Sequence, residues 1–385
     1  MIEMRVVNAF NMANDAYMVT KGLRRLGVKA ELIVQRPAHV ASLPQWEDAE
    51  IDLARVGDLY NPNWDALNEH WKIPEWIHVW NASGSWYLGS RTLRWVGLLR
   101  MLKPYDLVVG HVPFAKCGIL CRKPYIIYDA GWIRYLKMNT PAYRLARLGY
   151  RRARKIIFTN VDTYEMFLSQ GYGPDRLEFS PFAIDTDQYS PRPGSLGMSG
   201  ERNLLVFSPT RHEWREKGNE KLIKAFSNLA RRRPRAQLVL VGWGGDLFSS
   251  KKLIDELGIQ ENVAWVPPMH KKRLIEWYRS ADIVADQFVL GAYGTTAPEA
   301  MACAKPVLMY AEEQHFRRWH GAVPPVINAG SVDEILEMLH KLEDPAVRSE
   351  YGAKGREWVL HQHSLETVAK RHLGIYSEVL EEIES

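Results

Sequence analysis

Arg211 and Lys217 form the most specific chemical pattern in the sequence. They stand six residues apart in a charged loop that follows an apolar strand predicted over residues 203–208. An arginine fork binds two oxygen atoms at once and a lysine supplies a point charge, so together they suit a diphosphate. Physical reasoning alone does not rank Arg215 against Lys217. A charged, solvated loop with no ligand is the alternative interpretation.

A glycine loop that leads into a short helix is a second candidate anion site. The sequence predicts a buried strand over residues 283–289 and a helix of small residues over residues 299–304. Free N–H groups at the start of such a helix favour phosphate. The residues of this turn that are candidates for nucleotide binding are Gly294, Thr295, Thr296 and Glu299.

Glu299 has two competing interpretations. A carboxylate offers only hydrogen-bond acceptors, which suits a partner with paired hydroxyls, such as a ribose. Alternatively, Thr296 and Glu299 form a capping box that binds no ligand. A second capping box is predicted at Ser331 and Glu334, where a helix begins.

Polar side chains also follow two predicted strands in the first half of the chain. His111 follows a strand over residues 106–110, and Asp129 ends a strand over residues 124–129. Ligands of open α/β sheets collect at the carboxyl ends of strands, so either side chain is a candidate to orient an acceptor hydroxyl or take its proton. A structural histidine is the alternative for His111.

Charge is unevenly distributed along the 385 residues, whose formal net charge is +5. Residues 132–155 contain eight Lys or Arg and no Asp or Glu. We expect the basic 134–155 segment to contact an anionic membrane peripherally, and a solvated helix face is the alternative. No nucleic-acid motif accompanies the segment, so nucleic acid is not expected as a partner.

The chain shows no sign of an extracellular or membrane-spanning protein. Three cysteines provide no disulfide framework, and no apolar run approaches the ~18 residues of a membrane span. The first residues enter a strand directly, without a signal peptide. We expect a cytoplasmic protein, with peripheral contact at the inner membrane face.

The residues from Glu299 onward read Glu-Ala-Met-Ala-Cys-Ala-Lys-Pro-Val, which resembles the nucleotide-sugar motif of glycosyltransferase family 4, the glycosyl transferases group 1. The resemblance implies an α/β protein of the GT-B fold, with two Rossmann-like doubly wound domains that face a cleft. Arg211 and Lys217 match the residues that grip the donor diphosphate. The donor-binding residues that it implies are Arg211, Lys217, Gly242, Val266, Met269, Gly294, Thr295, Thr296 and Glu299, and the catalytic candidates are His111, Asp129, Arg211 and Lys217.

The same resemblance sets the expected domain boundaries. An N-terminal acceptor domain is expected over residues 1–190 and a C-terminal nucleotide-sugar domain over residues 201–360. Residues 191–200 are rich in Gly, Pro and Ser and are the expected linker. A last helix over residues 361–385 is expected to cross back to the N-terminal domain.

The resemblance implies a retaining, metal-independent glycosyltransferase of the hexosyltransferase class. It would move a sugar from a UDP- or GDP-sugar to a hydroxyl of a glycan or lipid-linked acceptor. No cofactor other than the donor and no metal is expected, and the sequence shows no cluster of metal ligands.

Gly291 departs from the family pattern, because it stands where the family has a first glutamate that contacts the donor sugar. Asp286 or Gln287 could substitute for it. A catalytically impaired nucleotide-binding partner subunit and a nucleotide-sugar epimerase of the same architecture therefore remain as alternatives. Asp129 departs as well, since the family often has a His-Gly pair there.

Overall fold

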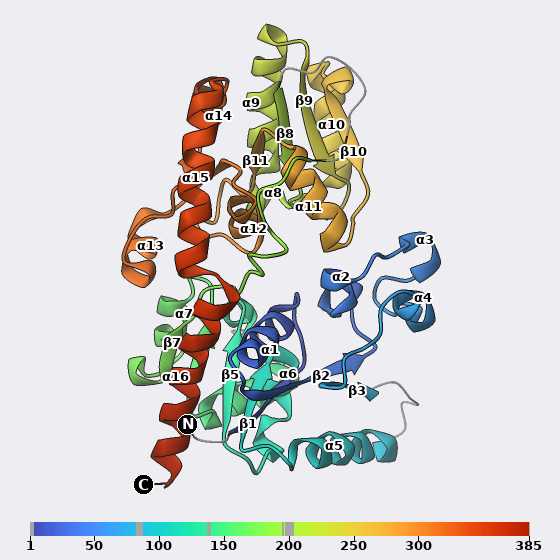
Figure 1. Ribbon diagram of the computed structural model, residues 1–385, viewed down its shortest axis with the longest axis vertical. Helices are drawn as coiled ribbons and strands as arrows, with labels where there is room; N and C mark the ends of the chain where they lie inside the picture. The colour runs from blue at the N-terminus through green and yellow to red at the C-terminus, as the bar shows by residue number, and fades with distance from the viewer. Residues whose placement is uncertain (1–3, 82–87, 137–139, 195, 197–203, 385) are drawn as a thin grey trace. The chain divides into compact units, whose positions relative to one another are not determined.

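The computed structural model divides the chain into two compact units (Figure 1). Unit 1 contains Met1–Ala183 and Leu365–Ser385, and unit 2 contains Ile184–Ser364. The structure describes residues 4–81, 88–136, 140–194, 196 and 204–384. Residues 195 and 197–200 of the expected linker lie outside this described part.

Unit 1 is built on a sheet of seven parallel strands in the order β3-β2-β1-β4-β5-β6-β7, counted in the described residues. The strands at its centre are apolar and almost fully buried, as parallel strands covered on both faces must be. Their bounds are β1 (Arg5–Ala9), β2 (Lys29–Arg36), β3 (Ile77–Asn81), β4 (Leu107–His111), β5 (Tyr125–Asp129), β6 (Ile156–Phe158) and β7 (Leu177–Phe179).

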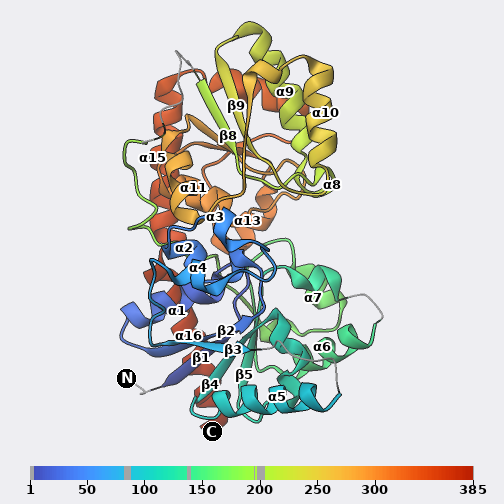
Figure 2. The same ribbon diagram turned by 90° about the vertical axis from the view of Figure 1, so that its right-hand side faces the viewer.

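Helices cover both faces of this sheet, with α1 and α16 on one face and α6 on the other (Figure 2). Gly22 permits the close packing of α1 on α16, because a Cβ there would lie 2.7 Å from the carbonyl oxygen of Leu365. The helices are α1 (Asp15–Arg25), α2 (Gln45–Asp48), α3 (Leu53–Val56), α4 (Trp64–Asn68), α5 (Leu88–Leu102), α6 (Pro141–Arg152), α7 (Tyr164–Ser169) and α16 (Leu365–Glu384).

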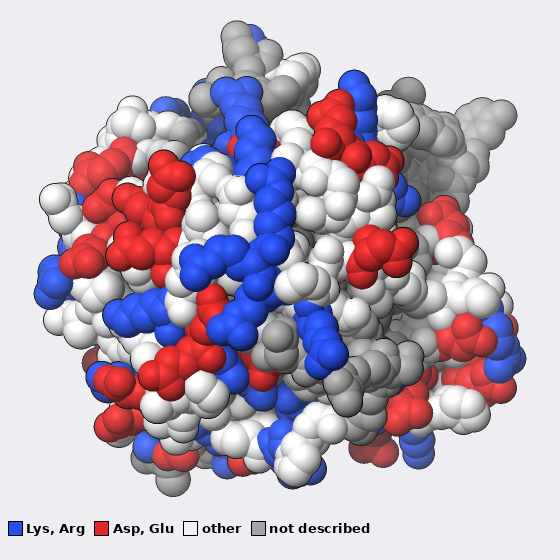
Figure 3. All heavy atoms as spheres, turned by 90° about the horizontal axis from the view of Figure 1, so that it is seen from above, with Lys and Arg blue, Asp and Glu red and all other residues white. Residues whose placement is uncertain are grey.

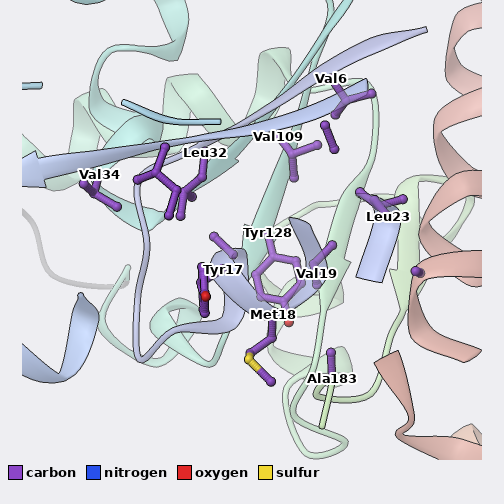
Figure 4. Close-up of a cluster of buried hydrophobic side chains, with 14 of the residues drawn as sticks. Val6, Tyr17, Met18, Val19, Leu23, Leu32, Val34, Val109, Tyr128 and Ala183 are labelled. Atoms are coloured by element: carbon purple, nitrogen blue, oxygen red, sulfur yellow. The ribbon is translucent and has the colours of Figure 1, made fainter. Parts of the chain in front are cut away.

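One hydrophobic cluster joins the sheet of unit 1 to α1 and α16. Figure 4 shows Tyr17 and Val19 of α1 beside the ring of Tyr128 from β5. From α16, Val368 and Tyr376 are fully buried in the same cluster. The last helix of the chain is therefore part of the core of the first unit.

Unit 2 is built on six parallel strands in the order β10-β9-β8-β11-β12-β13, again counted in the described residues. The expected α/β class with two doubly wound domains is thus confirmed. The strands are β8 (Leu204–Ser208), β9 (Ala236–Val241), β10 (Val263–Val266), β11 (Ile283–Ala285), β12 (Val307–Met309) and β13 (Ile327–Asn328).

The sheet of unit 2 lies between α9 and α10 on one face and α11 and α15 on the other (Figure 2). The capping box predicted at the start of α14 is confirmed, because the Ser331 side chain accepts from the Glu334 N–H and Glu334 accepts in return. The helices are α8 (Trp214–Lys217), α9 (Asn219–Arg232), α10 (Leu247–Leu257), α11 (Lys271–Ser280), α12 (Thr296–Ala302), α13 (Glu313–His320), α14 (Val332–Lys341) and α15 (Pro345–Gln362).

The two segments at which the chain enters and leaves unit 2 run side by side. The Ile184 N–H donates to the His363 carbonyl at 2.7 Å, and Ile184 forms a parallel bridge with Ser364. Within the described residues, no helix combines the length and the apolar character that crossing a lipid bilayer requires.

Candidate functional site

The loops at the carboxyl edge of the unit 2 sheet are tied together by backbone hydrogen bonds. The His212 N–H, after β8, donates to the Trp243 carbonyl after β9 at 2.8 Å. The Gly242 N–H donates to the Val266 carbonyl at the end of β10, also at 2.8 Å. Four of the donor-binding candidates, Arg211, Gly242, Val266 and Met269, lie on these loops. Their shared edge is the position at which doubly wound sheets bind ligands.

Arg211 lies in the loop after β8, and its guanidinium is partly exposed. One of its nitrogen atoms, Nη2, is 2.7 Å from the Glu216 carboxylate, and the side chain is 42% exposed. Its Nε is buried without a hydrogen-bond partner. The guanidinium is therefore anchored at one corner and keeps an unmatched donor.

Lys217 ends the single turn of α8, where Gly218 takes a left-handed conformation with φ of 67°. The Lys217 carbonyl accepts the Phe288 N–H at 2.8 Å, which joins this turn to the segment after β11. The positive charge of Lys217 acts on the buried carboxyl of Asp286, so the lysine lies near it. Arg215 of the same turn is exposed.

The glycines after β9 allow close approach between two loops. A Cβ on Gly244, whose φ is +111°, would lie 2.5 Å from the backbone N and O of His212. Gly242 is different, since a Cβ there would meet nothing closer than 3.7 Å. Gly244 therefore has a steric role that Gly242 lacks. Val266 and Met269, which follow on the neighbouring strand and loop, are partly buried.

The turn from β11 to α12 differs from the prediction at both ends. The strand ends at Ala285 and not at residue 289, because the Gln287 side chain closes a turn. Its Oε1 accepts the N–H groups of Val289 and Leu290 at 2.9 and 2.7 Å, and its Nε2 donates to the Tyr310 carbonyl. The helix begins at Thr296, three residues before the predicted start, and ends at Ala302.

Gly294, Thr295 and Thr296 are partly buried at the start of α12. Thr295 is the N-cap residue, and its side chain makes no capping hydrogen bond. The Ala297 N–H of the first turn donates to the Asp286 carboxylate. A protein carboxylate thus already uses one of the amide groups that we expected to attract phosphate.

Glu299 is held by two side chains of α11. Its Oε1 forms an ion pair with Lys271, and its Oε2 accepts from the Tyr278 hydroxyl at 3.0 Å. The Glu299 and Lys271 side chains are 4% and 13% exposed. The capping box predicted as the alternative for Thr296 and Glu299 is wrong, because the helix is capped one residue earlier and Glu299 binds α11 instead.

Gly291 adopts a left-handed conformation with φ of +68°. A Cβ at this position would lie 2.9 Å from the Glu312 Cβ and 3.0 Å from the Tyr310 ring. The backbone therefore favours glycine here on steric grounds. Of the two candidates to replace the missing glutamate, Gln287 uses its amide to hold the turn. The Oδ2 atom of Asp286 is buried without a hydrogen-bond partner.

In unit 1, His111 ends β4 in a buried aromatic cluster. Its ring stacks on Tyr128 with centroids 4.4 Å apart, and Tyr128 in turn lies 5.8 Å from His372. Burial, reinforced by the charge of His372, lowers the pKa of His111 to about 3. The imidazole is therefore neutral at physiological pH, and its buried Nε2 has no partner. This combination fits a hydrogen-bonding role better than a charged one.

Asp129 ends β5, and both of its carboxylate oxygens accept hydrogen bonds. They accept the N–H groups of Gly131 and Trp132 at 2.6 Å, the N–H of Ile133 at 3.0 Å and the Tyr150 hydroxyl at 2.5 Å. Burial raises the pKa of Asp129 above its ordinary value, and these hydrogen bonds oppose the shift. The geometry favours a positioning role, in which Asp129 holds the turn after β5.

Two residues of this site carried no signal in the sequence. Lys271 and Tyr278 sit seven residues apart on α11 and contact Glu299 from another element, and no local motif marks them. In the described residues, no group of three or more His, Cys, Asp or Glu is arranged to hold a metal ion.

Residues 195–357 match the family model described as glycosyl transferases group 1. A D-inositol 3-phosphate glycosyltransferase of Arthrobacter sp. is 30% identical over 54% of this chain and 51% of its own length. A GDP-mannose-dependent alpha-(1-6)-phosphatidylinositol monomannoside mannosyltransferase of Mycolicibacterium smegmatis is 28% identical over 60% of this chain and 63% of its own. The chain thus aligns with about half to two thirds of the length of these relatives.

A solved structure similar over nearly the whole chain is that of Alr3699/HepE from Anabaena in complex with UDP and glucose. It superposes with a TM-score of 0.71 over 97% of this chain and 99% of the other, at 16% sequence identity. This likeness confirms the fold expected from the sequence, with two Rossmann-like units of the GT-B type.

Proposed function

Because residues 195–357 match the family model of glycosyl transferases group 1, we propose that the protein is a retaining, metal-independent hexosyltransferase. It moves a sugar from a UDP- or GDP-sugar to a hydroxyl of a glycan or lipid-linked acceptor. The printed names of its relatives support this substrate class, since one uses GDP-mannose on a phosphatidylinositol glycolipid. UDP and glucose are bound in the structurally similar HepE.

One observation carries the proposal. The charges of Lys217, at the end of α8, and of Glu299, in α12, both act on the pKa of a single buried carboxyl, that of Asp286. The two motifs that suggested diphosphate binding and ribose binding are 82 residues apart in the sequence and meet at one sheet edge. Convergence of this kind is expected of a nucleotide-sugar site and not of a charged surface loop.

In the proposed reaction, the sugar leaves a diphosphate that gains negative charge. Arg211 and Lys217 stabilise this charge, and electrostatic stabilisation of a leaving group is often the largest catalytic effect. Glu299 accepts hydrogen bonds from the ribose hydroxyls. In unit 1, the neutral imidazole of His111 orients the acceptor hydroxyl, and Asp129 holds the turn that follows β5.

The experiment compares nucleotide affinities of matched variants. Arg211→Ala and Lys217→Ala each remove charged hydrogen bonds worth about 1.5–3 kcal/mol, so Kd for UDP or GDP rises about 10- to 150-fold. Arg215→Ala, which changes an exposed residue of the same turn, is the control and leaves Kd unchanged. Equal affinities in all three variants would reject the diphosphate site.

Turnover assays then test the reaction itself. UDP- and GDP-sugars are incubated with glycan and lipid acceptors, with and without EDTA, and the anomeric configuration of the product is read by NMR. We expect that the sugar is transferred with retention of its anomeric configuration and that EDTA does not abolish the transfer. Binding without turnover on any acceptor would indicate the impaired partner subunit. Interconversion of the sugar without release of diphosphate would indicate an epimerase.

The basic 134–155 segment supports peripheral contact with an anionic membrane, at the inner face and from the cytoplasm. Its residues 137–139 lie outside the described part. On α6, Leu145 and Leu148 are 37% and 48% exposed beside the exposed Arg144 and Arg151. Apolar and basic side chains that share an exposed helix surface suit an anionic lipid surface.

Vesicle sedimentation tests this contact. Arg151→Glu is expected to weaken binding to anionic vesicles, and added salt is expected to weaken binding of the unaltered protein. Arg231→Glu, at an exposed position of α9 in unit 2, is the matched control. Equal binding to neutral vesicles would contradict the proposal. Figure 3 shows one face of the molecule, on which a band of Lys and Arg is bordered by Asp and Glu, so charges of both signs are mixed on that face.

A further inference from the structure

Asp286 is a buried carboxyl for which the proposed reaction has no role. The residue is 5% exposed at the end of β11. One of its oxygens, Oδ2, has no hydrogen-bond partner, although it is buried. A buried carboxylate oxygen is costly when nothing donates to it, so its retention requires a reason.

The charges around Asp286 come from three elements packed against it. Lys217 of α8 favours its ionised form, and Glu299 of α12 disfavours it. Tyr278 of α11 also faces it, and Lys271 of α11 pairs with Glu299. Thr210 and the Ala297 N–H contribute hydrogen bonds that favour ionisation. Burial dominates and raises the pKa of Asp286 to about 6.

A diphosphate that binds to Lys217 would change this balance. The lysine would turn its charge to the phosphate oxygens, and Asp286 would gain an anionic neighbour. Both changes disfavour the ionised form of a buried acid, and the carboxylate has no further donor to compensate. The bound state can avoid two adjacent buried anions only if a proton enters from solvent.

We propose that the Asp286 carboxylate is an internal counter-anion, which partners Lys217 in the free protein and takes up one proton from solvent when a nucleotide diphosphate binds. Charge balances in this step, since the proton neutralises the carboxylate as the lysine passes to the diphosphate. Asp286 is a positioning residue, because it acts through Lys217 and not on the reacting atoms. This inference rests on the proposed diphosphate site.

Linkage gives the sign of the effect. Proton uptake on binding means that affinity rises as the pH falls, by at most about tenfold per pH unit. The window begins near the pKa of about 6 in the free protein and extends upward to the higher pKa of the bound state. At acidic pH, Asp286 is already neutral in the free protein, and the dependence disappears.

Isothermal titration calorimetry with UDP-glucose and GDP-mannose tests the inference. Nucleotide sugars are suitable probes because their phosphates are diesters and lack the second ionisation of a monoester, near pH 6. Titrations in buffers of different ionisation enthalpy at about pH 7 measure proton uptake directly, and a fraction of one proton is expected. The unaltered protein is expected to bind about fivefold or more weakly at about pH 8 than at about pH 6.

Asp286→Asn keeps the shape of the side chain and removes its titration. It is expected to bind the nucleotide sugar without proton uptake, with less than about twofold change over the same pH range, and more tightly than the unaltered protein at about pH 8. Asp255→Asn, at an exposed position of α10, keeps the full pH dependence as the control.

The outcomes separate this inference from the proposed function. If the unaltered protein binds a nucleotide sugar without proton uptake, the role of Asp286 is rejected and the donor site stands. If Asp286→Asn retains the pH dependence of the unaltered protein, the role is rejected as well. If the protein binds neither probe, both proposals fail. Should Asp286→Asn not fold, proton uptake by the unaltered protein decides.

Discussion

We expect that removal of the Lys271 charge destabilises unit 2 more than the loss of an exposed ion pair does. Lys271→Met deletes the ammonium that pairs with Glu299, while the Glu299 side chain is only 4% exposed. Breaking a buried ion pair on one side leaves an uncompensated charge and costs about 3–5 kcal/mol. The Tyr278 hydroxyl, at 3.0 Å, then still donates a hydrogen bond to the Glu299 carboxylate.

The double variant Lys271→Met/Glu299→Gln removes both charges and distinguishes charge from packing. Because no unpaired carboxylate remains, the loss is expected to fall below about 1.5 kcal/mol. Lys354→Met is the control, since Lys354 pairs with Glu350 on α15 and each of these two side chains is 59% exposed. Solvent screens such a pair, and no measurable loss is expected.

Hydrogen exchange of α12 peptides, followed by mass spectrometry, measures the opening free energy of this part of unit 2, and urea denaturation supplies the global value. The expected order of destabilisation is Lys271→Met, then the double variant, then Lys354→Met. The reasoning would be refuted if Lys271→Met were no more destabilised than Lys354→Met. A double variant less stable than Lys271→Met would refute it equally.

Three further outcomes follow from the structure. Burial lowers the pKa of His111 and of His372 from 6.5 to about 3. Between these two pH values, the two histidines bind protons in the unfolded chain and not in the folded protein. Each histidine therefore lowers the free energy of unfolding by about 2 kcal/mol at about pH 5 relative to neutral pH. Urea titrations that show the same free energy of unfolding at both pH values would contradict this. Gly244→Ala is expected to lower the melting temperature and weaken nucleotide binding, whereas Gly258→Ala, with nothing within 4 Å, costs only the backbone strain of about 1–2 kcal/mol. Gly291→Glu is expected to lower the melting temperature and not to raise turnover, because φ is +68° and its Cβ would meet Glu312.

Sequence patterns predicted the structure correctly where a feature depends on residues within one helix or strand. Apolar strands alternate with helices, and this predicted the doubly wound units because buried parallel strands need apolar runs. The Ser331 and Glu334 capping box was predicted from a spacing of three residues and is present. Such features depend on contacts within one turn of helix, so the sequence contains all of their determinants.

Contacts between elements could not be predicted in this way. Residues 283–289 look like one long strand, yet the strand ends at Ala285 because Gln287 binds the backbone of Tyr310 across the sheet edge. Lys271 pairs with Glu299 from 28 residues away, without a motif. Asp129 suggested acid–base chemistry, but Gly131, two residues after it and with φ of +98°, was the available sign of a turn that the carboxylate holds.

The order of α16 in the chain has a consequence for biosynthesis. Val368, Ala369, Tyr376 and Val379 complete the core of the first unit, but they are translated after all of unit 2. On the ribosome, the apolar face of α1 therefore stays uncovered until α16 has been synthesised. We expect the nascent first unit to expose this apolar surface during that interval, while unit 2 has its whole sequence available earlier.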